Sequence, residues 1–154
     1  TKTNKMHGIK IFFCPDFLAV DNLRRWMAVD AIVNGEGWEQ MQIGNLLFAN
    51  SERHMIVSSV SPLVFFDELI RALTVDRAFV TSPDQHYDLE ISRRHSESVL
   101  CYRNQRDIQI TGDTEALKSE VRKSLRDAVR LCNLLFPEMQ KSEKLAELLK
   151  KYGR

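Results

Sequence analysis

The sequence lacks the short motifs that mark common nucleotide-binding and catalytic sites. It has only six glycines among 154 residues, and it contains neither a GxGxxG stretch nor a GxxxxGK[ST] loop. Dinucleotide and phosphate binding through those loops are therefore excluded. The Gly-x-Ser-x-Gly context of a hydrolase nucleophile is also absent. These absences favour a protein that acts by binding rather than by catalysis.

Metal-binding patterns are equally scarce. No two of the four histidines are three or four positions apart, as paired helical ligands commonly are. These histidines are His7, His54, His86 and His95. The three cysteines form no CxxC pair and have apolar neighbours, so we expect free, buried thiols in a reducing compartment. They are Cys14, Cys101 and Cys132. We predict no metal and no cofactor.

Long apolar runs and a large charge imbalance are missing too. No segment approaches the roughly 18 apolar residues in succession that a membrane span needs. Residues 1–5 are polar and basic, and the apolar stretch after them is too short and too interrupted for a signal peptide. The net charge of +1 gives no support for general attraction to nucleic acid or an anionic membrane. We expect a cytoplasmic protein without membrane contact.

What the sequence does contain is the composition of a folded domain and a change of hydrophobic period. Apolar residues make up 44% of the chain and charged residues 28%, so we expect one domain over residues 1–154. Up to Thr111 the apolar residues mostly alternate, and from Asp113 they recur every three or four positions. The pattern predicts an α+β fold. Its mostly antiparallel sheet of about six to eight strands packs against one buried helix and a long C-terminal helix.

Alternating and apolar segments predict the strands. They lie at residues 8–14, 24–33, 38–43, 46–48, 53–60, 78–81, 86–92, 96–103 and 106–110. Both faces of residues 24–33 are apolar except at Asp30, which predicts a central strand. Asp30 then either forms a hydrogen bond in the core or opens onto a site. Trp26 and Trp38 are interpreted as core residues.

Capping residues and helical spacing predict three helices. Ser61 is placed to accept a hydrogen bond from the first turn of a helix with a wide apolar stripe. A long helix is predicted over residues 113–136, capped by Asp113 or Thr114. A short last helix is predicted after Ser142.

Two groups of charged residues are candidate binding surfaces. The first follows a predicted hairpin and offers both signs of charge on a rigid sheet, which suits a protein partner. We predict that it consists of Asp88, Glu90, Arg93, Arg94 and Glu97. The second is a basic stripe on the long helix, formed by Lys118, Arg122, Lys123, Arg126 and Arg130. Acidic residues at helical spacing accompany it, as on a solvated face, so nucleic-acid binding is the weaker interpretation.

The order of elements over residues 24–136 resembles that of small bacterial immunity proteins from contact-dependent and other polymorphic toxin systems. The carriers are the strand RWMAVDAIV, the glycine turn at residues 34–37, the helix SPLVFFDELI, the meander and the long last helix. The resemblance implies a cytosolic protein that neutralises one toxin domain by covering its active site or an essential surface. Many such proteins are acidic because their toxins are basic nucleases. This chain differs from them in its net charge of +1, so its charge does not favour a nuclease as the partner.

The leading hypothesis is a non-catalytic binding protein, an immunity protein or similar inhibitor of a cognate toxin domain. An alternative from another class is an enzyme whose site is assembled from the scattered residues His54, His86 and Cys101. A third is a secretion chaperone or structural subunit that dimerises through the sheet or the long helix. The oligomeric state, monomer or homodimer, stays open at this point.

Overall fold

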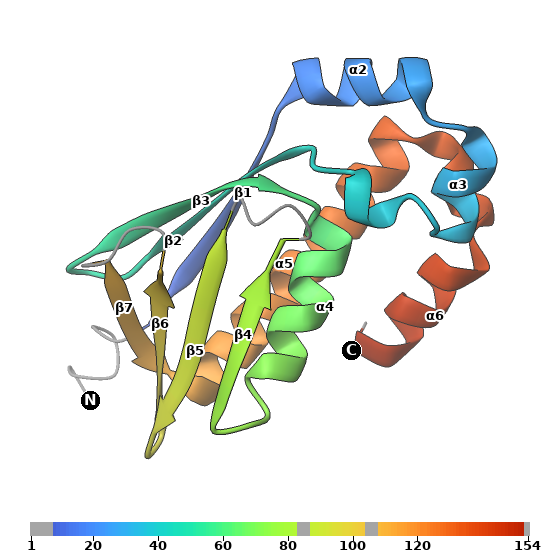
Figure 1. The fold of residues 1–154 in the computed structure, drawn as a ribbon. Coiled ribbons are helices and arrows are strands. Elements are labelled where there is room, and N and C mark those ends of the chain that lie inside the picture. The colour runs from blue at the N-terminus through green and yellow to red at the C-terminus, as the bar shows by residue number, and fades with distance from the viewer. Residues whose placement is uncertain (1–7, 83–86, 104–107, 153–154) are drawn as a thin grey trace.

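Two antiparallel sheets and the helices around them make up the fold in the computed structural model, which describes residues 8–82, 87–103 and 108–152 (Figure 1). Sheet A has the order β1-β2-β3, with β1 (Lys10–Pro15), β2 (Gly44–Ala49) and β3 (His54–Val60). Sheet B is a meander of β4 (Arg77–Thr81), β5 (Asp88–Arg94), β6 (Glu97–Tyr102) and β7 (Gln109–Asp113). Every pair of neighbouring strands is antiparallel.

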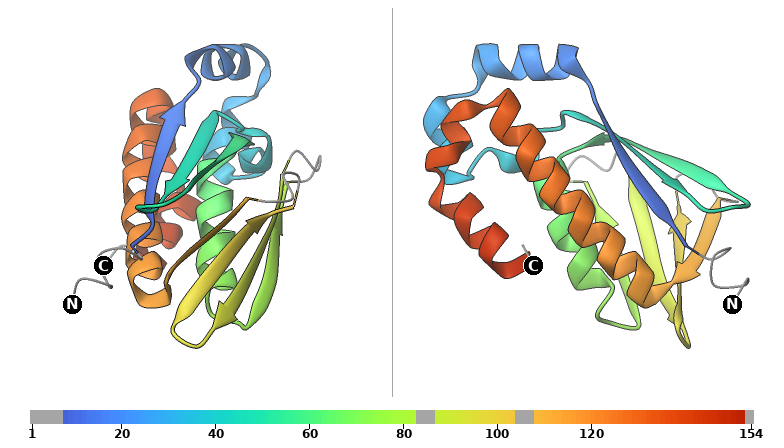
Figure 2. Two further views of the ribbon diagram at one scale, coloured as in Figure 1. Left: turned by 90° about the vertical axis from the view of Figure 1, so that its left-hand side faces the viewer. Right: turned by 180° about the vertical axis from the view of Figure 1, so that it is seen from behind.

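The prediction of an α+β fold is confirmed, but the strands divide between two sheets instead of forming one. The division occurs at the helix α4 (Pro62–Ala72), which follows β3 and carries the chain from sheet A to sheet B. Since α4 packs against both α5 (Thr114–Leu135) and β4, β4 begins a new ladder with β5 instead of extending sheet A beside β3. Figure 2 shows α4 between sheet B and the long helix α5.

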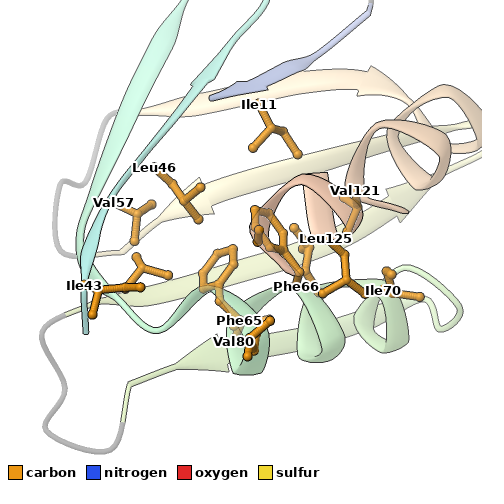
Figure 3. Packing of buried hydrophobic residues seen from close by; sticks show 14 of the residues in the cluster. Ile11, Ile43, Leu46, Val57, Phe65, Phe66, Ile70, Val80, Val121 and Leu125 are labelled. Atoms are coloured by element: carbon orange, nitrogen blue, oxygen red, sulfur yellow. The ribbon is translucent and has the colours of Figure 1, made fainter. Parts of the chain in front are cut away.

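The core occupies the space that the two sheets share with α4 and α5. Side chains from sheet A and both helices converge there (Figure 3). Phe65 of α4 is fully buried at 0% exposure, and its ring centroid lies 6.1 Å from Phe48, 5.9 Å from Phe66 and 5.5 Å from Tyr87. Tilted and edge-on rings at such distances attract each other beyond their burial. The predicted buried helix and long helix are both confirmed by this packing.

Residues 24–33 were expected to form a central strand, and this prediction is wrong. They belong to two helices, α2 (Phe17–Trp26) and α3 (Val29–Asn34). The Asp16 carboxylate starts α2, because it accepts hydrogen bonds from Leu18 N at 3.1 Å and Ala19 N at 3.2 Å. The buried stripe of α2 is Val20 and Leu23, while Trp26 is 60% exposed and therefore is not a core residue.

Asp30 has neither of the two expected roles. It is exposed in the first turn of α3, where a carboxylate suits the positive end of the helix dipole. The turn at residues 34–37 is confirmed: Gly35 ends α3 with φ of 85°, in the left-handed region that favours glycine.

Residues 38–43 do not form a returning strand either. The chain coils into the 3-10 helix η1 (Trp38–Gln40) around the indole of Trp38, which is only 3% exposed. Trp38 Nε1 donates to the Ile32 carbonyl at 2.8 Å, and the Ser61 hydroxyl donates to the Trp38 carbonyl. Ser61 therefore precedes α4 as predicted, but its side chain anchors η1 instead of capping the helix. Trp38 is confirmed as a core residue.

The remaining helix boundaries agree with the predictions. Asp113 caps α5 by accepting from Ala116 N at 2.9 Å. After α5 come η2 (Pro137–Lys141) and α6 (Glu143–Tyr152), and Ser142 Oγ accepts from Leu145 N at 3.2 Å. Phe136 separates the end of α5 from Pro137, whose missing N–H cannot continue the hydrogen bonds of the helix.

The expectation of three buried thiols holds for one cysteine only. Cys132 is buried in α5, and its burial raises the pKa of the thiol to about 12. Cys14 is exposed, because the alternation of β1 sends Ile11 into the core and Cys14 to the opposite face. Cys101 is half-buried on the outer face of sheet B. All three are free.

Candidate functional site

The outer face of sheet B, which points away from α4 and α5, carries most of the predicted partner-binding residues. Along β5 the side chains of Leu89 and Ile91 are buried in the core, so Asp88 and Glu90 project from the other face. Arg94 pairs directly with Glu97 of β6, which places both at the far end of the same face. The antiparallel register thus brings four of the five predicted residues onto one surface.

Arg93 does not share that surface. Ser92 and Arg94 both point to the outer face, so the alternation of β5 places Arg93 on the opposite face, on the side of the helices. Its Nη2 atom lies 3.9 Å from Glu115 Oε2 in the first turn of α5. Arg93 therefore connects sheet B to α5 and is half-buried.

At the other end of the outer face, five residues from β4, β5 and the turn after β6 form a cluster around Phe79. The ring of Phe79 is 47% exposed and lies between two guanidinium groups: Cζ of Arg77 is 5.4 Å from the ring centroid and Cζ of Arg103 is 5.3 Å from it. Arg77 Nε donates to Glu90 Oε2 at 2.7 Å. Arg103 Nε lies 3.5 Å from Asp88 Oδ2. We call this set the Phe79 cluster.

The Phe79 cluster contributes little to the stability of the fold, but its contacts hold the side chains in fixed positions on the surface. Exposed cation–π contacts and surface ion pairs are each worth about 1 kcal/mol or less. However, each arginine is held by both a ring and a carboxylate, on strands that pair in register. The side chains are therefore already ordered before any partner arrives. Sequence reasoning found Asp88 and Glu90 but missed Arg77, Phe79 and Arg103, because strand pairing brings them together.

Comparisons with known proteins were made with the whole chain. No protein-family model, curated protein or solved structure matches it. Among the helices that the structure describes, none has both the length and the apolar composition of a membrane span. Within the same described residues, no group of three or more His, Cys, Asp or Glu side chains is arranged to hold a metal ion. What the protein does is therefore inferred from its own side chains.

A second candidate is a cavity of about 550 Å³ between α4, α6 and the turn before η1. Acidic and basic side chains from these segments line it together: Glu36, Glu39, Asp67, Glu68, Glu147, Arg71, Lys144 and Lys151. Asp67, one of the lining residues, accepts a hydrogen bond from the Tyr152 hydroxyl at its Oδ1 atom at 2.7 Å. Lys144 Nζ lies 4.8 Å from the centroid of the Trp38 ring. No sequence motif could have shown this site, because its residues come from distant segments.

Glu68 is the electrostatically unusual residue of that cavity. Burial raises the pKa of its carboxyl group, the nearby Arg71 lowers it, and the like charge of Glu39 raises it further. The net direction is upward. Glu68 therefore holds a proton at a higher pH than an exposed glutamate does.

The residues of the enzyme alternative are not brought to one site where the structure describes them. His54 is exposed at the start of β3 in sheet A, whereas Cys101 lies in β6 of sheet B. His86 lies outside the described residues.

On the basic stripe of α5, Lys118 Nζ lies 3.2 Å from Glu115 and Arg130 Nη1 lies 3.3 Å from Asp127. Acidic residues thus accompany the stripe, as on a solvated face.

Proposed function

We propose that this protein is a non-catalytic binding protein, an immunity protein that neutralises a cognate bacterial toxin domain in the cytoplasm by direct binding. The observation that carries the proposal is the Phe79 cluster on the outer face of sheet B. Of the elements that carried the resemblance, the helix α4, the meander of sheet B and the long helix α5 are present, whereas residues 24–33 are mostly helical instead of forming a strand. The surface would cover the active site or an essential surface of the toxin domain.

The composition of the Phe79 cluster is that of an interface centre. Residues that dominate binding energy at protein interfaces are most often tryptophan, tyrosine and arginine, and aromatic residues in general are enriched there. Phe79 offers an exposed ring with two arginines beside it. Ordering a long side chain on binding costs about 0.5–1.5 kcal/mol. Because the contacts of Arg77 and Arg103 already order them, much of that cost is avoided.

The carboxylates of the cluster give the partner orientation. Asp88 and Glu90 lie on one strand, and Arg94 and Glu97 lie at its other end, so charges of both signs are distributed along the face. Complementary charges fix the register of a complex and raise its association rate. The site residues of the proposal are therefore the Phe79 cluster with Arg94 and Glu97.

The test is a calorimetric titration of the purified protein with the variable C-terminal domain of a secreted protein encoded beside its gene. We expect tight binding, together with protection of cells that express the toxin domain. Phe79→Ala should weaken binding by about 2 kcal/mol or more, roughly 30-fold. The matched control is Phe12→Ala on the outer face of sheet A, where the ring is similarly exposed at 54%.

Two results would overturn the proposal. One is a gene neighbourhood without such a protein, combined with no binding to the toxin domains of related systems. The other is equal binding by the Phe79→Ala variant, the Phe12→Ala variant and the wild type.

A further inference from the structure

The protein covers the outer edges of its sheets at two of the strands. On β1, the Ile11 N–H points away from β2 and donates to Glu120 Oε2 of α5 at 2.9 Å. On β7, the Thr111 carbonyl accepts from Asn50 Nδ2, which reaches over from the β2–β3 turn, at 3.1 Å. Each side chain takes the place of a neighbouring strand. Unpaired edges are sites where another chain can add a strand, so such covering has a purpose.

Within residues 8–82, 87–103 and 108–152, no side chain forms such a hydrogen bond with the free edge of β4. Asp76 accepts from Arg93 N at 2.8 Å and Ser82 N donates to the Tyr87 carbonyl at 3.3 Å, which sets the alternation of the β4–β5 ladder. In an antiparallel ladder every second residue bonds to the partner strand, so Ala78 and Val80 face β5. The N–H and C=O groups of Arg77 and Phe79 point to the free side.

A groove runs along this free edge. A cavity of about 340 Å³ lies between α4 and β4, lined by Glu68, Arg71, Ala72, Val75, Ala78 and Phe79. Its lining includes two alanines, which leave room, and α4 provides a wall behind the position that a further strand would occupy (Figure 1). A strand edge beside a helix is a known arrangement for binding an extended segment through main-chain hydrogen bonds.

The charges of the groove are ordered along it. Glu68 also borders a neighbouring cavity lined by Thr81 and Ser82, so it lies toward the Thr81 end of β4. Arg71 follows Glu68 by about one turn of α4 and lies toward the connection to β4. From the Thr81 end of β4 to its Arg77 end, the groove therefore presents an acidic side chain and then a basic side chain.

We propose that the free edge of β4 binds an extended segment of a partner protein, which adds to sheet B as an antiparallel strand with a basic residue beside Glu68 and an acidic residue beside Arg71. The residue between these two lies opposite Phe79 and shares its face, because directly opposed residues of paired strands do so. The partner's identity rests on the proposed function, since the same Phe79 cluster borders the groove. The pairing itself involves only this protein's groove and backbone.

The probe is a capped five-residue peptide, Thr-Lys-Val-Glu-Thr. Antiparallel to β4, it places its lysine near Glu68, its valine opposite Phe79 and its glutamate near Arg71. The matched control is Thr-Glu-Val-Lys-Thr, which has the same composition in the opposite order. Two further peptides carry an N-methyl group either on the valine, whose N–H faces Phe79, or on the glutamate, whose N–H faces solvent.

The measurement is amide hydrogen exchange by NMR with each peptide in excess. We expect the first peptide to slow exchange at Arg77 and Phe79, and to leave Ala78 unchanged because its N–H already bonds to β5. N-methylation of the valine should weaken binding about tenfold, whereas N-methylation of the glutamate should not. Ile56 of β3 is the control for unspecific addition, since its N–H also points away from its partner strand.

The proposal is overturned if both peptide orders bind equally, if Ile56 is protected as strongly as Phe79, or if neither N-methyl group matters. No toxin domain is used, so this result is independent of the calorimetric titration. If the peptide binds as expected but the calorimetric titration finds no toxin domain that binds, the groove remains a strand-binding site and the immunity function is refuted. If a toxin domain binds in the titration but the peptide does not bind in the groove, the immunity function stands and the strand addition is refuted.

Discussion

Replacing Phe65 by alanine should be among the most destabilising single changes in this protein. The side chain has 0% exposure and three aromatic rings within 6.1 Å, centroid to centroid, so the variant loses both burial and ring contacts. Buried Phe→Ala substitutions cost about 3–5 kcal/mol, and aromatic pairs are worth about 0.5–1.5 kcal/mol beyond their burial. We therefore expect the upper half of the first range, about 4–5 kcal/mol.

Urea unfolding followed by circular dichroism measures this loss. With a slope of about 2 kcal/mol per molar urea, the midpoint should fall by roughly 2 M at unchanged slope. Phe12→Ala is the matched control, because its ring is 54% exposed and Phe12 alternates with the buried Ile11 on β1. We expect that variant to lose about 1 kcal/mol or less. Similar losses in the two variants would refute the assignment of Phe65 to the centre of the core.

Three further predictions concern other sites. The exposed Cys14 should react with a thiol reagent in the native state, as measured by the absorbance of the released chromophore. Cys132 should react only after unfolding, because burial raises the pKa of its thiol to about 12. Since burial raises the pKa of Glu68 above its ordinary value of 4.5, its stabilising contribution is present below that pH and is lost as the pH rises through the folded-state pKa. The free energy of unfolding of Glu68→Gln, relative to that of the wild type, should therefore be higher at about pH 7 than at about pH 4, as measured by urea unfolding. Gly35→Ala should lower the melting temperature by about 3–6 °C, because φ is 85° and the new methyl group would collide with the Lys144 side chain.

Each of these has a result that would count against it. Equal reactivity of the two cysteines would contradict the burial of Cys132. A Glu68→Gln variant whose stability follows that of the wild type at every pH would show that the carboxyl is not desolvated. The control for Gly35 is Gly8→Ala, which meets no atom within 4 Å. Equal melting temperatures in these two variants would contradict the close approach of Lys144.

How much of the fold could be predicted depended on whether one local signal dominated. The long helix α5 has a side-chain cap at Asp113 and a regular apolar stripe, and both could be read from the sequence. Residues 26–33 are apolar at every position except Asp30, so an alternating pattern fits them as well as a helical one. The decisive signal was Asp16, whose carboxylate caps α2, but it also fits a residue that simply ends a strand.

The candidate site shows the same limit on a larger scale. The alternation of β5 correctly predicted that Asp88 and Glu90 face away from the buried Leu89. It did not predict that Arg103 reaches back over Phe79, because that contact depends on which strands pair and in which register. The division into two sheets was also hidden, since a helix between strands is compatible with either one sheet or two.

The packing of α5 against strands of both sheets has a consequence for how the chain is made. Sheet B consists of consecutive strands, whose hairpins need only short loops to close. The helix that covers both β1 and the inner side of β6 and β7, however, begins only at Thr114. During synthesis, the apolar surface that α5 covers on both sheets therefore remains exposed until α5 has left the ribosome. A nascent chain paused before that helix should bind chaperones and aggregate more readily than one released just after it.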